Sequence, residues 1–193
     1  ENGAWAHAGS ARVLSKTDSA ASFEVDTTDG TARGKLTVDV VIEGAKVRLK
    51  TAVANEPGTT DAPWNKLSLS FALAPEDHFF GLGERYASVD HRGVSMYSWS
   101  EEGGSGKGEK VPADEQNPFP NGPSMTYFPV PFFHASRGFA MHMATTYRTE
   151  THFGSEQGQA EAWRITVNNT ALEAVLYVHD DPLASLDDFT RDT

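Results

Sequence analysis

The sequence predicts an all-β fold, an antiparallel β-sandwich with a short helix at its carboxyl end, and three observations support this. Short segments in which apolar and polar residues alternate recur at intervals of about ten residues. Turn-forming residues such as Thr28, Asp29 and Gly30 separate these segments. A helical spacing of apolar residues occurs only in residues 182–193. Together they indicate a sandwich rather than a parallel sheet.

The predicted strands are taken in chain order. Residues 36–42 read LTVDVVI and alternate, and residues 47–53 resume after Glu43 and Gly44, which is typical of a β-hairpin. Four later strands are each predicted by apolar residues on a shared face: Leu67, Leu69, Phe71 and Leu73; Phe139, Met141 and Met143; Trp163, Ile165 and Val167; and Leu172, Ala174, Leu176 and Val178.

The closing segment, residues 182–193, is predicted to be a helix. Pro182 suits a first helical turn, and Leu183, Leu186 and Phe189 are spaced three apart. Asp181 comes directly before the proline, so it is interpreted as the N-cap rather than as a cation ligand.

Composition limits the function classes. A length of 193 residues fits one or at most two domains, and we expect a single domain over 1–193. The formal net charge of −11 disfavours nucleic acids and anionic membranes, and no stretch approaches the roughly 20 apolar residues that cross a bilayer. The absence of cysteine excludes disulfides and thiolate chemistry but leaves the compartment open, with a bacterial secreted or periplasmic location favoured.

Residues 79–104 have the most informative composition in the chain. Glycines, aromatic side chains and carboxylates alternate there in a way that is not typical of ordinary core strands and suits a sugar ligand. Residues 103–131 then form a glycine- and proline-rich excursion, longer than the 12–15 residues or so that compact domains usually tolerate. Because this excursion also carries aromatic residues, including Tyr127, Phe128, Phe132 and Phe133, we expect most of it to pack against a surface.

Several chemical motifs fail on spacing. GGSGKG lacks both the leading glycine and the closing hydroxyl of a phosphate loop, and no histidine pair has the spacing of zinc proteases. We therefore expect no metal and no cofactor. Glu101 and Glu102 are adjacent, so on an extended strand they point to opposite faces and at most one of them meets a substrate.

Three segments, FFGLGER, DHRG and SWSEEGG, resemble the N-terminal, galactose mutarotase-like β-sandwich of glycoside hydrolase family 31, whose members include retaining α-glycosidases. The resemblance extends to TYFPVPFFHASRGFAMHM and to PLASLDDFTRDT, which is similar to the helix that leads into the catalytic barrel of the family. The SEEGG run looks closer to the sulfoquinovosidase branch than to the maltase branch. The resemblance thus implies a carbohydrate substrate and a barrel domain C-terminal to Thr193.

The resemblance also implies a site. Within residues 79–131, the family's loop lines the sugar pocket, and its matching positions here are Trp99, Glu101 and Glu102. Both catalytic aspartates of the family lie in the barrel, so no catalytic residue is expected in this chain. Two alternatives stay open: a free-standing carbohydrate-binding module, and a mutarotase-like enzyme, which would need an acid and a base of its own, such as a His with a Glu.

Overall fold

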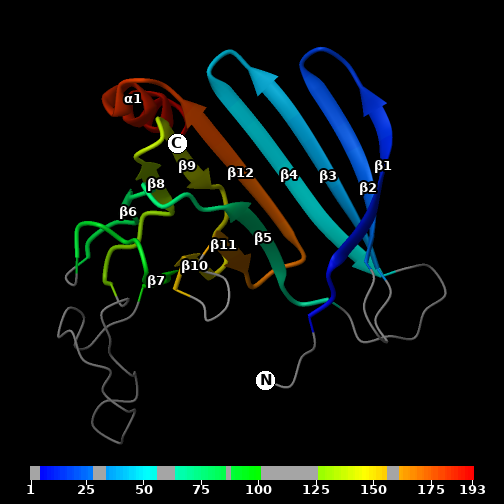
Figure 1. Ribbon diagram of the computed structural model, residues 1–193, viewed down its shortest axis with the longest axis horizontal. Coiled ribbons are helices and arrows are strands. Elements are labelled where there is room, and N and C mark those ends of the chain that lie inside the picture. Colours follow the sequence, from blue (N-terminus) through cyan, green and yellow to red (C-terminus); the bar gives the residue numbers. More distant parts are fainter. Residues whose placement is uncertain (1–4, 28–33, 56–63, 86–87, 101–125, 156–160) are drawn as a thin grey trace, which may run out of the picture.

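Two antiparallel β-sheets face each other in the computed structural model, which describes residues 5–27, 34–55, 64–85, 88–100, 126–155 and 161–193 (Figure 1). The larger sheet has eight strands in the order β1-β2-β3-β4-β12-β9-β8-β6. These are β1 (Ala8–Lys16), β2 (Ala20–Thr27), β3 (Gly34–Glu43), β4 (Lys46–Asn55), β12 (Ala171–Val178), β9 (Phe139–Met143), β8 (Phe132–Ala135) and β6 (Phe79–Gly81). The smaller sheet consists of β5 (Leu67–Ala72), β11 (Ala162–Val167), β10 (Thr149–Phe153) and β7 (Ser95–Ser98). The predicted all-β sandwich is confirmed.

The main core lies between the sheets and follows the period of two along each strand. Met141 and Met143 of β9 and Leu172 and Ala174 of β12 project into it from the larger sheet. The facing strands β5 and β11 contribute the residues predicted to share a face: Leu67, Leu69 and Phe71, and Trp163, Ile165 and Val167. The predicted apolar faces are therefore largely inward faces, although Val178 at the end of β12 and Ile42 near the end of β3 are exposed.

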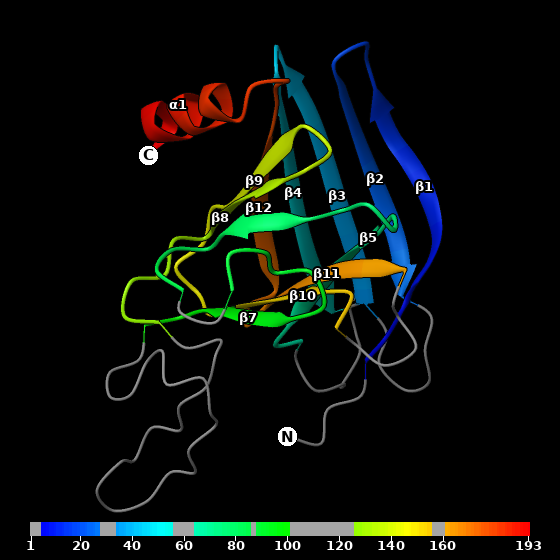
Figure 2. The same ribbon diagram turned by 60° about the vertical axis from the view of Figure 1, so that its left-hand side comes forward.

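A second apolar cluster occupies the opposite face of the larger sheet, where helix α1 (Pro182–Asp192) covers it (Figure 2). Val175 and Tyr177 of β12 alternate with the inward residues of that strand and pack under the helix. Phe189 stacks on Phe132, with 4.2 Å between ring centroids. These central strands are thus buried on both faces, which explains why β12 and β9 carry nearly continuous apolar runs.

The predicted helix and its cap are confirmed. The side chain of Asp181 accepts a hydrogen bond of 2.9 Å from the amide of Leu183, as an N-cap does. One detail differs from the expected apolar stripe, because Leu183 and Leu186 are exposed and Phe189 makes the contact with the sheet.

The interpretation of residues 79–104 as unlike core-forming strands is wrong for part of the segment, and residues 101–104 lie outside the described residues. Phe79, Leu82 and Met96 are buried in the main core, and β6 and β7 belong to the two sheets. The glycines make the burial possible: a Cβ at Gly81 would lie 2.8 Å from the carbonyl oxygen of Phe132. The segment combines core anchors with exposed residues such as Trp99.

Candidate functional site

Trp99 directly follows β7 and is the predicted site residue that the structure places. Its side chain is half-exposed and lines a hollow of about 280 Å³. Three segments form this hollow: the end of β7, the prolines before β8, and the connection between β9 and β10. The lining residues are Ser98, Trp99, Ser100, Pro129, Pro131, Thr145, Thr146 and Tyr147. An exposed indole beside hydroxyl groups is a suitable surface for a sugar ring.

Beside this hollow, hydrogen bonds join the residues on either side of 101–125. Ser100 and Thr126 form an isolated parallel bridge, and the hydroxyl of Ser100 donates to the carbonyl of Tyr127 at 2.8 Å. Thr126 is buried, and its hydroxyl donates to the carbonyl of Glu84 at 2.6 Å. Ser100 and Thr126, which flank residues 101–125 in the sequence, therefore lie side by side next to Trp99.

Glu101 and Glu102 lie outside the described residues, so two of the three predicted site residues are not placed. Their neighbour Ser100 is placed, and it borders the hollow. Most of the excursion also lies outside the described residues, so the expectation that it packs against a surface stays a prediction. Tyr127 and Phe128, near its end, are exposed, whereas Phe132 and Phe133, which follow it in β8, are buried.

The connection between β6 and β7 contacts the end of β7, next to Trp99. Arg85 donates through Nε to the carbonyl of Leu82 at 2.9 Å and through a terminal nitrogen to the carbonyl of Tyr97 at 2.7 Å. Burial lowers the pKa of Arg85 to about 10, so the guanidinium stays charged at neutral pH. Gly83 (φ +84°) lies so close to the segment before β8 that its Cβ position is 2.1 Å from the carbonyl oxygen of Phe128. These contacts fix the end of β7 from which Trp99 extends.

A row of polar side chains continues from the site across the outer face of β7 and β10. The guanidinium of Arg148 lies 4.1 Å from the ring centroid of Tyr97. Glu150 contacts His152 Nε2 at 3.3 Å, and the Nδ1 of the same ring is 2.7 Å from the hydroxyl of Ser95. The hydrogen bond from His152 lowers the pKa of Glu150 despite its partial burial. Because this carboxylate is held charged and paired, the row is suited to positioning β7 rather than to donating a proton.

Two absences concern the described residues alone. Within those ranges, no group of three or more His, Asp or Glu side chains could hold a metal ion. No helix in the described part of the chain is long and apolar enough to cross a bilayer.

The fold and site define a β-sandwich domain with an aromatic hollow at the edge of its smaller sheet. The family model described as the glycosyl hydrolase 31 N-terminal galactose mutarotase-like domain matches residues 5–151, and the chain belongs to this family. Among curated proteins, the sulfoquinovosidase of Escherichia coli strain K12 is 30% identical over 83 residues, which are 41% of this chain and 12% of that protein.

Solved structures show the same fold. A family 31 sulfoquinovosidase from E. rectale, in complex with an aza-sugar inhibitor, has a TM-score of 0.69 at 16% identity, covering 93% of this chain and 25% of its own. A cycloalternan-forming enzyme from Listeria monocytogenes, in complex with a pentasaccharide substrate, has a TM-score of 0.59 at 16% identity, covering 94% of this chain and 22% of its own. The chain thus spans a quarter or less of the length of these relatives.

The sequence missed three features of the site. Tyr147 lines the hollow, and Ser100 and Thr126 close the base of the excursion. No local pattern marks Tyr147, which lies in a connection between strands. Ser100 and Thr126 are separated by residues 101–125, so no short sequence pattern includes both partners of the bridge.

Proposed function

We propose that this chain is the non-catalytic N-terminal domain of a retaining α-glycosidase, to which it contributes scaffold and a segment that lines the substrate pocket. The catalytic barrel would follow Thr193 and would carry both catalytic aspartates. One observation carries the proposal: half-exposed Trp99 lies beside the bridge between Ser100 and Thr126, the two residues that flank 101–125 in the sequence. Family membership supports the same placement.

Within this proposal, the three site residues have different roles. Trp99 would pack along the apolar face of a sugar ring, where the exposed indole offers a flat surface. Glu101 or Glu102, but not both, would accept hydrogen bonds from ring hydroxyls, because adjacent residues on an extended strand face opposite ways. The segment would therefore act on binding and orientation, and the chemistry would belong to the barrel.

The substrate class that we propose is an α-glycoside, either an α-glucoside or a sulfoquinovoside. Similarity to two sulfoquinovosidases favours the second. Comparing hydrolysis of aryl α-glucosides and aryl α-sulfoquinovosides by the longer enzyme would decide between them.

The proposal is tested first on the chain itself. We expect the 193-residue chain to show no turnover of either aryl glycoside, because the proposed acids lie outside it. Turnover that survives purification and depends on Glu101 or Glu102 would overturn the proposal.

The second test uses the longer enzyme. There, Trp99→Ala should lower kcat/KM by about tenfold, as the loss of one positioning contact in the transition state does. The control is Val89→Ala, which shortens a side chain that is 80% exposed and should leave kcat/KM unchanged. If Trp99→Ala behaves like this control, the indole does not line the pocket.

A second candidate function is a free-standing carbohydrate-binding module. It is favoured by the exposure of four aromatic side chains near the hollow: Trp99, Tyr127, Phe128 and Tyr147. Calorimetry with mono- and oligosaccharides separates the two functions. A Kd of about 1 mM or lower that is lost in Trp99→Ala favours the module, whereas no binding at this hollow favours a pocket completed by the barrel.

A further inference from the structure

A second hollow of about 240 Å³ lies at the other edge of the smaller sheet, away from Trp99. It is next to β5, whereas Trp99 follows β7, and β11 and β10 separate these two edge strands. Three strand spacings place the two edges roughly 14 Å apart. The hollow is therefore distinct from the candidate site described above.

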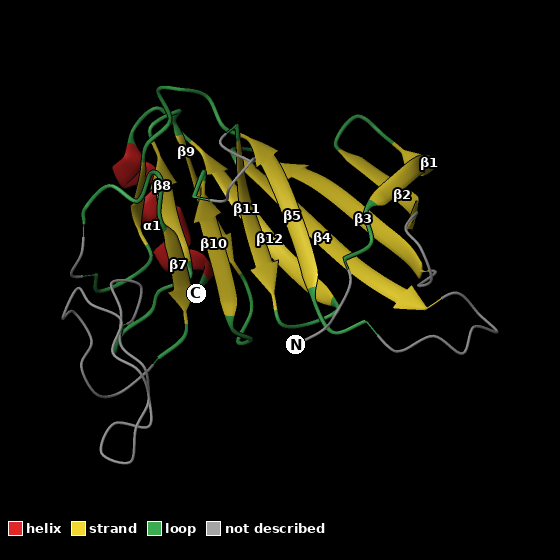
Figure 3. Cartoon of the chain, turned by 60° about the horizontal axis from the view of Figure 1, so that its bottom comes forward, coloured by secondary structure: helices red, strands yellow, loops and turns green. Residues whose placement is uncertain are grey.

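The larger sheet has more strands than the smaller sheet, so part of its inner face is left uncovered and forms the floor of this second hollow. The four-stranded sheet ends at β5, and β1, β2 and β3 extend beyond it (Figure 3). Leu36 of β3 and Val53 of β4, which are paired in register, lie on the inner face at this boundary. Both are partly buried and line the hollow, so they give it an apolar floor.

Two tryptophans stand at the walls. Trp64 leads into β5, and its indole is packed so closely on Gly34 that a Cβ there would lie 2.5 Å from its Nε1 atom. Trp5 is 46% exposed, and the guanidinium of Arg164 lies 5.9 Å from its ring centroid. Trp64 is thus packed against Gly34, and Trp5 against Arg164. The two tryptophan side chains line the hollow.

The remaining lining is mixed, because Ala6, Ala8 and Leu67 add apolar surface beside polar residues. Thr27, Asn65 and Ser68 offer hydroxyl and amide groups, and among the described residues of the lining Lys66 alone is ionisable. Ligands that pair apolar ring faces with hydroxyl edges match such a surface.

We infer that the hollow between Trp5 and Trp64 binds one pyranose ring of a neutral oligosaccharide, independently of the Trp99 site. Its volume lies slightly below the roughly 300–1,000 Å³ of pockets for drug-sized ligands, which suits a single ring. An indole face would cover the ring, and Asn65 and Lys66 would meet its hydroxyl groups. Such a site would hold a distant part of a long substrate.

The experiment is a titration followed by nuclear magnetic resonance, with maltotriose and isomaltotriose as probes and the indole N–H signals as reporters. The chain has four tryptophans, so each hollow has its own signals. We expect the Trp5 and Trp64 signals to shift and saturate with a Kd of about 1 mM. Trp5→Ala should weaken the response of Trp64 about tenfold, and Asn65→Ala should weaken it several-fold.

The matched control is Trp99→Ala, because Trp5 and Trp99 are equally exposed, at 46%. This variant should leave the responses of Trp5 and Trp64 unchanged. Three results would overturn the inference: shifts confined to Trp99, a Trp64 response unaffected by Trp5→Ala, or a response to glucose 6-sulfate but to neither neutral probe. Since the two hollows are read separately, failure here leaves the proposed function of the Trp99 site standing.

Discussion

Gly83 lies where the turn after β6 meets residues 128–130, just before β8, and there is no room for a side chain at this position. Its φ of +84° favours glycine, and the carbonyl of Phe128 occupies the place of a side chain. The next residue, Glu84, donates a hydrogen bond of 3.1 Å from its amide to the same carbonyl of Phe128.

Gly83→Ala should therefore destabilise the domain by about 3–5 kcal/mol in urea unfolding, combining backbone strain with a steric clash. The control is Gly93→Ala, since Gly93 has a similar φ of +76° and nothing within 4 Å of its Cβ position. That variant should cost about 1–2 kcal/mol. Equal losses in the two variants would show that the close approach to Phe128 is unimportant.

Asp77 is the buried carboxylate of the turn before β6. It accepts hydrogen bonds from Arg137 and, at 2.7 Å, from the amide of Ala74. Burial acts to raise the pKa of Asp77, but these hydrogen bonds outweigh it and the pKa is lowered. A lowered pKa in the folded state means stability that is present above the unfolded pKa of about 3.9 and is lost as pH falls below it.

We expect Asp77→Asn to destabilise the domain at pH 7 by about 1–3 kcal/mol, and this difference from the unmodified chain to shrink as pH falls from about 5 to 3. Urea unfolding over this pH range measures it. Asp187→Asn removes an exposed partner of Arg191 and should change stability by less than about 0.5 kcal/mol at every pH. A difference for Asp77→Asn that stays constant with pH would contradict the assigned shift.

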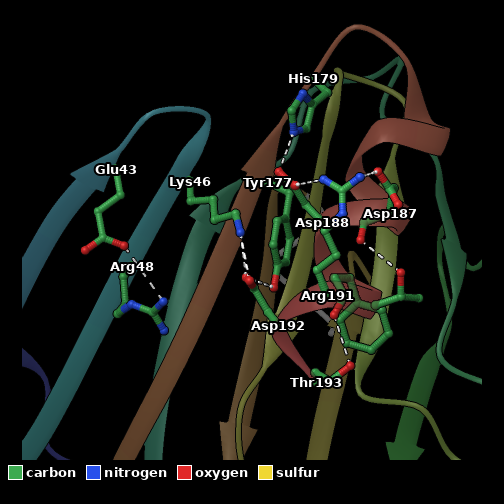
Figure 4. Close-up of polar contacts among 12 residues, drawn as sticks. Glu43, Lys46, Arg48, Tyr177, His179, Asp187, Asp188, Arg191, Asp192 and Thr193 are labelled. Carbon is green, nitrogen blue, oxygen red and sulfur yellow. Dashed lines mark hydrogen bonds and ion pairs between the residues drawn. The ribbon is translucent and has the colours of Figure 1, made fainter.

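Helix α1 is held on the larger sheet by the stack of Phe189 on Phe132. A polar network, which Figure 4 shows, adds to this contact. Asp192 accepts from Lys46 at 2.8 Å and from the Tyr177 hydroxyl at 3.1 Å, and His179 contacts Asp188 at 3.0 Å. The charged partners in these contacts are partly exposed to solvent, which weakens each ion pair, so the stack of Phe189 on Phe132 should contribute most.

Phe189→Ala should lower the free energy of unfolding by about 2–3 kcal/mol and speed hydrogen exchange over residues 182–192. Leu183→Ala is the control on the same helix, because that side chain is 69% exposed and should matter by less than about 0.5 kcal/mol. Unchanged exchange in Phe189→Ala would mean that the polar network suffices to hold the helix.

The elements differ in how well the sequence predicted them, and the reason lies in what each strand buries. Strands β3, β4, β5, β9, β11 and β12 present apolar inward faces, so alternation identified them. Strand β10 was missed because Thr149 and Thr151 share its inward face with Phe153, so hydroxyl groups mask the pattern. Strands β6 and β7 were missed because each is too short to show a period.

The same argument applies to the candidate site. Trp99 came from a family resemblance and not from any period, and its contact with a sugar stays a prediction. The bridge between Ser100 and Thr126 depends on the fold bringing distant segments together. The Trp5 and Trp64 hollow depends on the unequal widths of the sheets, which no local pattern encodes.

Across the larger sheet, the burial of side chains decreases from the central strand β12 to the edge strand β1. Strand β12 is hydrogen-bonded to β4 and β9 and is covered by the main core on one face and by α1 on the other. Strand β1 pairs with β2, its register shifts at two places, and all nine of its residues are exposed. Its stability therefore comes from the ladder and from surface pairs such as Arg12 with Glu24.

We expect amides of β1 to exchange through local opening, at rates that barely change with low urea, because opening an exposed edge uncovers little surface. Amides of β12 should exchange only on global unfolding and show the full urea dependence. Val13→Ala, at a side chain that is 57% exposed, should leave β12 exchange unchanged, whereas Ala174→Gly in the core should accelerate it. Equal protection of β1 and β12 would mean that the overhanging strands unfold together with the sandwich, as one cooperative unit.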